Sequence, residues 1–244
     1  MSPNYHAWAN VEEAEDLSRN EKTEEAREAF QQAAKLFSEA QESISNQLKT
    51  IETNEEERTA KDLIDASDIR QEYCRGRVVL EDARMLDRQG DHLASSKKYG
   101  ESVEIFQGVM DAQIREPDKE ELQPIINLCM AWEKMMLAET QMSPSLYSEA
   151  AELFIEARDN SSDQTTRLLA QAHSSFCKAL EAGTRFELTR ETDLFSEAKR
   201  HIEASTSYYL RAGHQTMSDY ASSTSRFLDA YLYTYNAQTE IDLN

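Results

Sequence analysis

Hydrophobic residues recur along most of the chain at spacings of three and four positions, with polar residues between them. This spacing places the hydrophobic residues on one face of an α-helix. Long runs of β-branched residues that alternate with polar ones, which are typical of strands, are missing. The pattern therefore predicts an all-α protein.

Break signals divide the chain into about nine antiparallel helices. Prolines suit the first turn of a helix, side chains such as Asn, Asp and Ser cap its start, and glycines follow its end. The expected starts are Pro3, Glu24, Asn54, Asp91, Pro124, Pro144 and Ser161, with two more helices after the weak stretch 183–189 and after Gly213. Helices of this number and length need partners of similar length, so we expect them to pack side by side.

A motif of alternating small and large residues recurs in four of these helices. Its copies are Ala26, Phe30, Ala33 and Phe37; Ser95, Tyr99, Ser102 and Phe106; Ser143, Tyr147, Ala150 and Phe154; and Phe195, Ala198 and Ile202. Small residues let two helices approach closely, and large residues fill the space between neighbouring pairs. The motif predicts tandem helix pairs in one domain over 1–244, with units of roughly 3–52, 55–115, 118–160 and 162–212 and a capping helix over 214–240.

The stretch Leu86–Phe106 resembles a tetratricopeptide repeat, with Gly90 at the turn, Ser95 at the small position and Tyr99 at the aromatic one. The copies lie 69, 48 and 48 residues apart, and the helices are long, which is more similar to the helical sheet of soluble NSF attachment proteins. This resemblance implies a superhelical scaffold that holds a peptide or partner helix, without catalysis. In length, acidity and number of helices the chain is also similar to the 14-3-3 proteins.

Net charge and cysteine content narrow the partners and the compartment. The net charge of −20 repels phosphate backbones and anionic membranes, so we expect no nucleic acid partner. Apolar runs are too short for a membrane span, which predicts no membrane insertion. The three cysteines are an odd number and lie far apart, and the first residues lack a secretory pattern, which favours the cytoplasm.

The sequence contains no phosphate-binding glycine loop, no zinc-protease motif and no nucleophile elbow. We therefore expect no catalytic residues, no cofactor and no metal, and a protein that is not an enzyme. The alternative is a regulatory protein that binds a ligand or a metal. His173 and Cys177 lie one turn apart, and His201 in the next helix is a candidate third ligand.

The third helix carries Arg70, Arg77, Arg84 and Arg88 at spacings of seven, seven and four. These four residues, called the arginine stripe below, share one helical face. Guanidinium groups bind carboxylates and phosphates well, so the stripe is a candidate site for an acidic or phosphorylated protein segment. The alternative is pairing within the helix, with Glu81 and Asp87 as the acids.

The last helix carries Tyr220, Phe227, Tyr231 and Tyr235 on one face. Tyrosines suit protein interfaces, so Tyr220, Tyr231 and Tyr235 are candidate partner contacts. The alternative is a cap that lies back on the core. A third hypothesis is a structural subunit that forms a homo-oligomer through this C-terminal helix.

Overall fold

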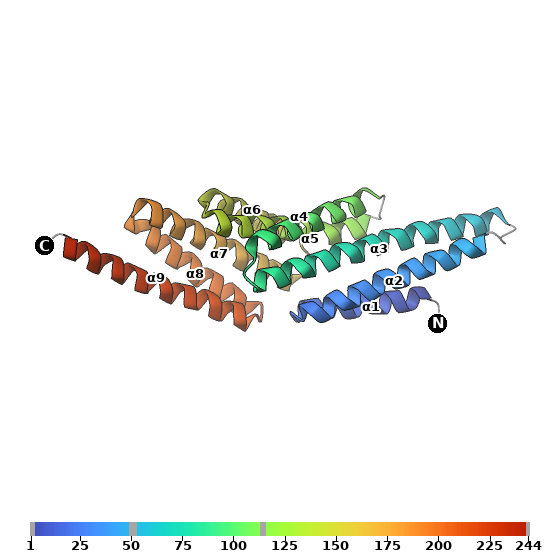
Figure 1. Cartoon of the computed structure of the whole chain (residues 1–244), viewed down its shortest axis with the longest axis horizontal. Helices are drawn as coiled ribbons and strands as arrows, with labels where there is room; N and C mark the ends of the chain where they lie inside the picture. Colours follow the sequence, from blue (N-terminus) through green and yellow to red (C-terminus); the bar gives the residue numbers. More distant parts are fainter. Residues whose placement is uncertain (1–2, 49–52, 113–115, 243–244) are drawn as a thin grey trace. The chain divides into compact units, whose positions relative to one another are not determined.

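The computed structural model describes residues 3–48, 53–112 and 116–242, and within these ranges the chain forms nine α-helices and no strand (Figure 1). Their bounds are α1 Pro3–Arg19, α2 Thr23–Leu48, α3 Asn54–Arg88, α4 His92–Asp111, α5 Glu116–Gln141, α6 Pro144–Asn160, α7 Gln164–Thr189, α8 Thr192–Arg211 and α9 Gln215–Asp242. The all-α prediction is confirmed.

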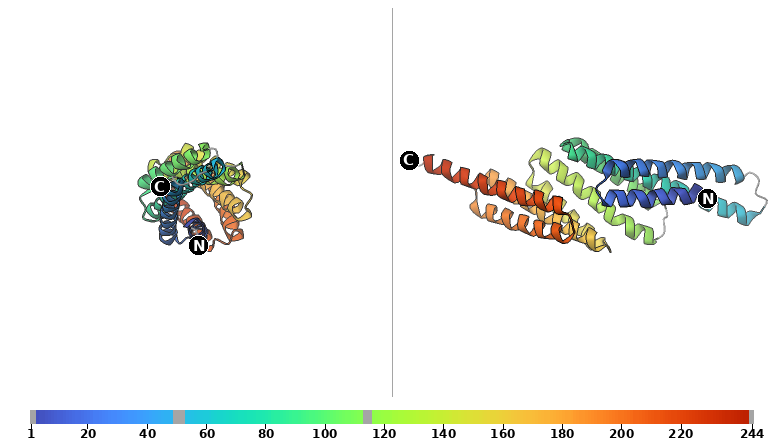
Figure 2. Two further views of the ribbon diagram at one scale, coloured as in Figure 1. Left: turned by 90° about the vertical axis from the view of Figure 1, so that its right-hand side faces the viewer. Right: turned by 90° about the horizontal axis from the view of Figure 1, so that it is seen from below.

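The chain divides into two compact units, Met1–Leu122 and Gln123–Asn244. In the first unit, α2 packs against α1 and α3, and α3 packs against α4. In the second unit, α7 packs against α6 and α8, and α8 packs against α9, as the side-by-side ribbons of α8 and α9 show in Figure 2. The extent of a single repeat domain and its unit boundaries stay a prediction.

Side chains and glycines define several helix ends. Thr53 caps α3 by accepting a hydrogen bond from the Glu56 amide at 3.3 Å. Asp91 caps α4 in the same way, through the Ala94 amide at 3.0 Å. Gly90 and Gly213 follow α3 and α8 with φ values of 80° and 81°, a backbone conformation that glycine adopts without steric cost. The predicted breaks at Gly90 and Gly213 are confirmed.

Three predicted helix starts differ from the structure: two capping residues are misplaced by one or two positions, and one helix begins earlier than expected. Thr53 is the cap of α3, and Asn54, which was expected to be the cap, is the first helical residue. Asp163 caps α7 through the Thr166 amide at 2.6 Å, whereas Ser161 ends α6. Pro124 lies inside α5, which begins at Glu116. A proline inside a helix removes one hydrogen bond, and buried residues such as Ile126 continue the helix beyond it.

The stretch 183–189 is helical, and α7 continues through it to Thr189. Glycine in a helix costs only about 1 kcal/mol relative to alanine. Ala182 and Phe186 flank Gly183 and are both buried, so packing outweighs that cost. The break comes instead at Arg190, whose φ of 62° ends α7.

The repeated motif forms much of the core. Its buried members are Ala26, Phe30, Ala33, Phe37, Ser95, Tyr99, Ser102, Phe106, Tyr147, Ala150, Phe154, Phe195, Ala198 and Ile202. Serines at small positions also bond to the preceding helix. Ser95 Oγ donates to the Ala83 carbonyl at 2.9 Å, and Ser102 Oγ donates to the Gly76 carbonyl at 3.0 Å. The motif therefore packs α2, α4 and α8 each against the helix that precedes it, as the sequence predicts.

Candidate functional site

Arg77, the most buried member of the arginine stripe, joins α3 to α1. Its Nη1 donates to Glu15 Oε1 and, at 3.1 Å, to the Tyr73 hydroxyl. Its Nη2 donates to Ser18 Oγ at 3.1 Å, and its guanidinium carbon lies 4.6 Å from the centre of the Phe30 ring. Only 5% of Arg77 is exposed. This guanidinium therefore bonds inside the protein.

Glu81, one turn after Arg77 on α3, belongs to the same hydrogen-bond network and is fully buried. Its Oε1 accepts hydrogen bonds from Ser18 Oγ at 2.7 Å and from Arg84 Nη1 at 2.9 Å. Arg77 Nη2 lies 3.9 Å from the same oxygen. Arg84 Nη1 also donates to Ser18 Oγ at 2.7 Å, while 36% of the Arg84 side chain remains exposed. One serine of α1 is thus held by two arginines and one glutamate of α3.

The two ends of the arginine stripe also contact α1 or the turn that follows it. The guanidinium carbon of Arg70 lies 4.5 Å from the centre of the Trp8 ring, a favourable cation–π distance. Arg88 Nη2 donates to the Glu21 carbonyl at 3.1 Å. All four arginines therefore contact the segment that contains α1 and the α1–α2 turn. Their contact with an outside partner stays a prediction.

Glu15 and Tyr73 in this network have shifted pKa values: that of Glu15 is lowered and that of Tyr73 is raised. Burial favours the protonated form of Glu15, but the positive charge of Arg77 and hydrogen bonds from Tyr73 and Arg77 hold its pKa below the usual value. Burial raises the pKa of Tyr73, with the Glu15 charge acting in the same sense. Because the pKa of Glu15 is lowered by folding, its stabilising contribution is present above the unfolded pKa and is lost as pH falls through the folded one.

The sequence predicted the arginines of the network but not their partners on α1. Of the two acids expected to pair within α3, Glu81 does bond to Arg84, whereas Asp87 lies 3.3 Å from His92 Nδ1. Glu15 and Ser18 were missed. Their spacing of three residues on a predicted helix places them on one face, which was the available signal.

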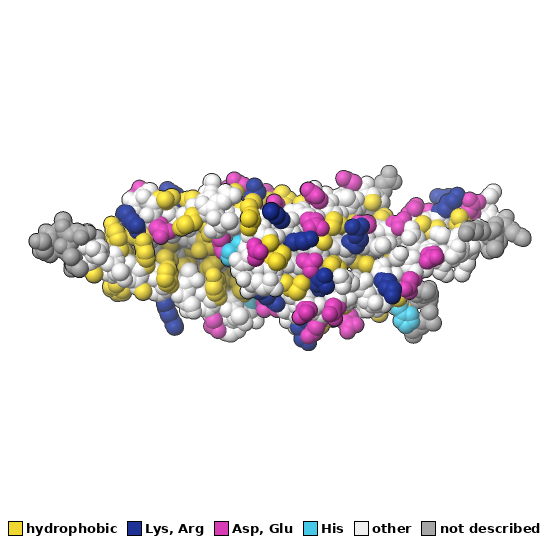
Figure 3. Space-filling model, in the orientation of Figure 1, with side chains coloured by type: hydrophobic (Ala, Val, Ile, Leu, Met, Phe, Trp, Pro, Cys, Tyr) yellow, Lys and Arg dark blue, Asp and Glu magenta, His cyan; other side chains and the backbone are white. Residues whose placement is uncertain are grey.

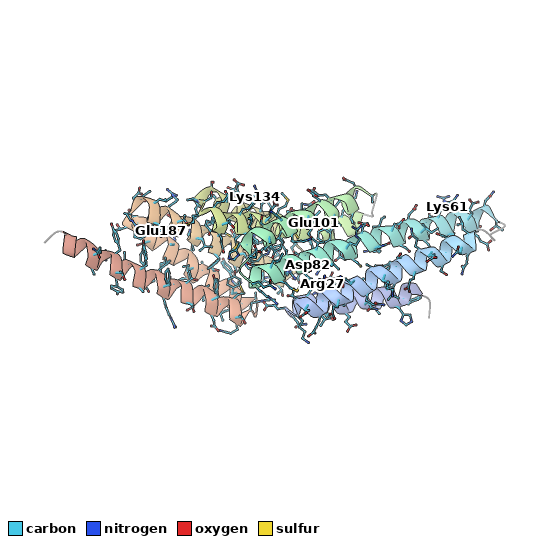
Figure 4. The ribbon with its side chains drawn as sticks, in the orientation of Figure 1. Arg27, Lys61, Asp82, Glu101, Lys134 and Glu187 are labelled. Atoms are coloured by element: carbon cyan, nitrogen blue, oxygen red, sulfur yellow. The ribbon has the colours of Figure 1, made fainter. Side chains whose placement is uncertain are left out.

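A second ion pair ties α2 to α3 near this network. Arg27 Nε donates to Asp82 Oδ1 at 2.6 Å, and Figure 4 shows the two side chains side by side between these helices. About a third of the Arg27 side chain (32%) and a quarter of the Asp82 side chain (25%) are exposed. Ion pairs thus join α3 to both α1 and α2.

In the second unit, the C-terminal half of α9 lies back against α7. The rings of Tyr231 and Tyr235 lie 6.2 and 5.9 Å from the Phe186 ring. Arg190, at the end of α7, donates from Nη1 to the Tyr231 hydroxyl at 2.6 Å and lies 5.4 Å from the Tyr235 ring centre. Both tyrosines are half-buried and thus cap this end of the core.

The same side of α9 also carries aromatic residues that are open to solvent. Tyr220 is 57% exposed although its ring lies 5.8 Å from the Phe176 ring, and Phe227 is 69% exposed. We call Tyr220, Phe227, Tyr231 and Tyr235 the aromatic surface; Figure 3 shows hydrophobic side chains gathered over α7 and α9 in this unit. Tyr233 of α9 is 76% exposed and lies outside the set of aromatic residues that the sequence predicted as partner contacts.

His173 lies in an aromatic cage. Its Nδ1 is 2.6 Å from the Tyr209 hydroxyl, and its ring centre lies 4.4 Å from Trp132 and 5.1 Å from Phe154. Within the part of the chain that the structure describes, no three histidine, cysteine or acidic side chains are grouped to hold a metal ion. The cage and the Tyr209 contact account for the burial of His173.

The three cysteines are expected to resist modification in the folded protein. Cys74, Cys129 and Cys177 are free and buried. Burial raises the pKa of the Cys74 thiol to about 12 and raises that of Cys177 as well. Because the thiolate is the reactive form, iodoacetamide at neutral pH should label none of them in native protein and all of them in denaturant, as counted by intact mass. Rapid stoichiometric labelling of native protein would contradict this burial.

The fold and the site define a class, an all-α protein built of consecutive packed antiparallel helices that is compatible with a helical repeat fold. No family model, no curated protein and no solved structure matches the chain. Among the described residues, no helix has the length and apolar character needed to cross a membrane.

Proposed function

We propose that the protein is a non-enzymatic scaffold of the tetratricopeptide-like, long-helix type, which binds a peptide or partner helix through the aromatic surface of α9. The observation that carries this proposal is the exposure of Tyr220 and Phe227, at 57% and 69%, on α9. Large aromatic side chains exposed on one face of a helix favour a role in binding.

The chemistry of the surface favours an apolar helical segment as the partner. Tyr231 and Tyr235 are already packed on Phe186, so they offer rigid ring faces at little cost in side-chain entropy. Tyr220 and Phe227 lie seven residues apart, which is two helical turns. A partner helix with apolar residues at the same spacing would place one side chain against each ring.

The arginine stripe is the less favoured surface for this partner. Arg77 is buried and its guanidinium already bonds to Glu15 and Ser18. Binding of an acidic or phosphorylated segment there would have to replace contacts that hold α1.

Free, buried thiols support a reducing compartment, and we place the protein in the cytoplasm.

The proposal is tested by selecting binders from a library of helical peptides and measuring their dissociation constants by calorimetry. We expect a variant with Tyr220→Ala and Phe227→Ala to bind about tenfold or more weakly, since central aromatic residues dominate interface energies. Tyr5→Ala with Leu63→Ala is the matched control, because both side chains are exposed in the first unit. A third variant, Arg84→Glu with Arg88→Glu, reports on the arginine stripe.

The variants that lose peptide affinity show whether the aromatic surface or the arginine stripe binds the partner. Equal binding by wild type and the aromatic variant, with loss in the arginine variant, would move the partner to the arginine stripe. No saturable binder from the library would count against the scaffold itself. Circular dichroism of each variant shows whether helix content is unchanged.

A further inference from the structure

The edge of α9 that turns away from α7 carries two opposite charges. Asp219 and Arg226 are both exposed and lie seven residues apart, so they occupy nearly the same angular position on the helix. Each directly precedes an exposed aromatic residue, Tyr220 or Phe227. The pattern of acid and aromatic, then base and aromatic, covers two helical turns.

These two charges are not used to pair α9 with the rest of its unit. Seven residues of helix separate Asp219 from Arg226 by about 10 Å, which is too far for a direct ion pair within α9. Asp219 Oδ1 accepts a hydrogen bond from Gln215 at 2.8 Å, and Arg226 has no ion pair among the described residues. By contrast, Asp229 of α9 bonds to Lys199 of α8 at 2.7 Å. The opposite charges along the outer edge remain available.

We propose that a second copy of the chain binds along this edge, with the two α9 helices antiparallel and related by a two-fold axis between Ser222 and Ser223. In this register Asp219 of each copy lies opposite Arg226 of the other, so that two ion pairs form. Phe227 of each copy falls between Thr216 and Tyr220 of the second copy. Every contact occurs twice, as in any two-fold symmetric interface.

Charge selects this arrangement over the alternatives. A parallel pair of α9 helices would place Asp219 beside Asp219 and Arg226 beside Arg226, and like charges between helices are destabilising. Antiparallel pairing centred nearer Arg226 would bring the two copies of that arginine together. Small side chains at Ser222 and Ser223 leave room for the two backbones to approach at the axis.

This dimer goes beyond the proposed scaffold function, because its charged contacts lie outside the aromatic surface. It rests on that function only in taking α9 as the contact helix. Tyr220 and Phe227 belong both to the aromatic surface and to the contact between the two copies. Since the second copy supplies both the acid and the base, no other partner is needed to neutralise the edge. The stack of helices would then continue from one α9 to the other.

The experiment is sedimentation velocity of the full chain over a range of concentrations. We expect a dimer for wild type, and a dissociation constant raised about tenfold or more by Asp219→Arg or by Arg226→Asp alone, since each change places like charges together twice. The double variant, Asp219→Arg with Arg226→Asp, should restore wild-type association. Arg200→Asp, an exposed arginine of α8, is the matched control and should leave association unchanged.

The charge swap also tests the register of the two α9 helices, that is, whether Asp219 of one copy lies opposite Arg226 of the other. Wild type that stays monomeric up to roughly 100 µM, a concentration that reveals even weak pairs, overturns it. A dimer that the single reversals do not weaken, or that the double reversal does not restore, overturns the α9 register. A monomer that still binds peptides through the aromatic surface would leave the scaffold function standing while the dimer fails.

Discussion

Replacing Arg77 with alanine is expected to lower the free energy of unfolding by about 3–5 kcal/mol, the usual cost of removing one partner from a buried ion pair. The change leaves Glu15 without its cation and takes one of two arginines from the fully buried Glu81. It also removes the contact with Phe30, a core residue of α2. Urea denaturation followed by circular dichroism measures the effect.

Arg75→Ala is the matched control for this prediction. Arg75 lies two positions away on the same helix, and its only described ion pair, with Glu72, is about half exposed. Exposed pairs of this kind contribute little to stability. The denaturation midpoint of this variant should stay close to that of wild type. If the two variants lose similar amounts of stability, the buried network is not what holds α1 against α3.

Replacing Gly76 with alanine is expected to destabilise the protein by about 1–3 kcal/mol, the cost of overpacking a core. A Cβ built at Gly76 would lie 2.6 Å from Cε1 and 2.9 Å from Cδ1 of Phe106. Phe106 is fully buried on α4, so its ring moves only if its neighbours move as well. The helices α3 and α4 would therefore have to separate, and the hydrogen bond from Ser102 to the Gly76 carbonyl would lengthen.

Replacing Gly108 with alanine should stabilise the protein, in contrast to the same change at Gly76. Gly108 also lies inside a helix, but a Cβ built there meets no atom within 4 Å. Alanine then stabilises the helix by roughly 0.5–1 kcal/mol relative to glycine. Thermal melts of the two variants separate packing from propensity. A melting temperature that rises for both would show that Phe106 yields more easily than its burial indicates.

The sequence predicts the fold well because the repeat motif combines local and tertiary information. Ala33 and Phe37 show helical spacing, and their alternation of size also specifies contact with another helix; both are buried. Boundaries were harder where local preference and packing disagree. Gly183 weakens a helix in isolation, but Phe186 three residues later is buried and holds α7 together.

The site was less predictable because its pairing is not local. The spacing of Arg77 and Arg84 shows that they share a face of α3, but it does not show what covers that face. Ser18 and Glu15, their partners, lie about sixty positions earlier in the chain. Tyr231 and Tyr220 illustrate the same point on α9. Both lie on one face of α9, but Tyr231 packs on Phe186 and bonds to Arg190 and is half-buried, whereas Tyr220 is largely exposed.

The serine hydroxyls at small positions of the motif bear on how interchangeable the helix pairs are. Ser95 and Ser102, two small positions of the motif on α4, donate to carbonyls of the preceding helix at 2.9 and 3.0 Å, and Ser205, three residues after the motif on α8, does the same at 2.9 Å. Ala33 of α2 has the same place in the motif as Ser102 but no hydroxyl to donate. A chimera that carries the α2 motif on α4 would therefore keep the shape of the contact and lose its directional bonds. The copies are alike in volume, but only some of them fix how far one helix slides along the next.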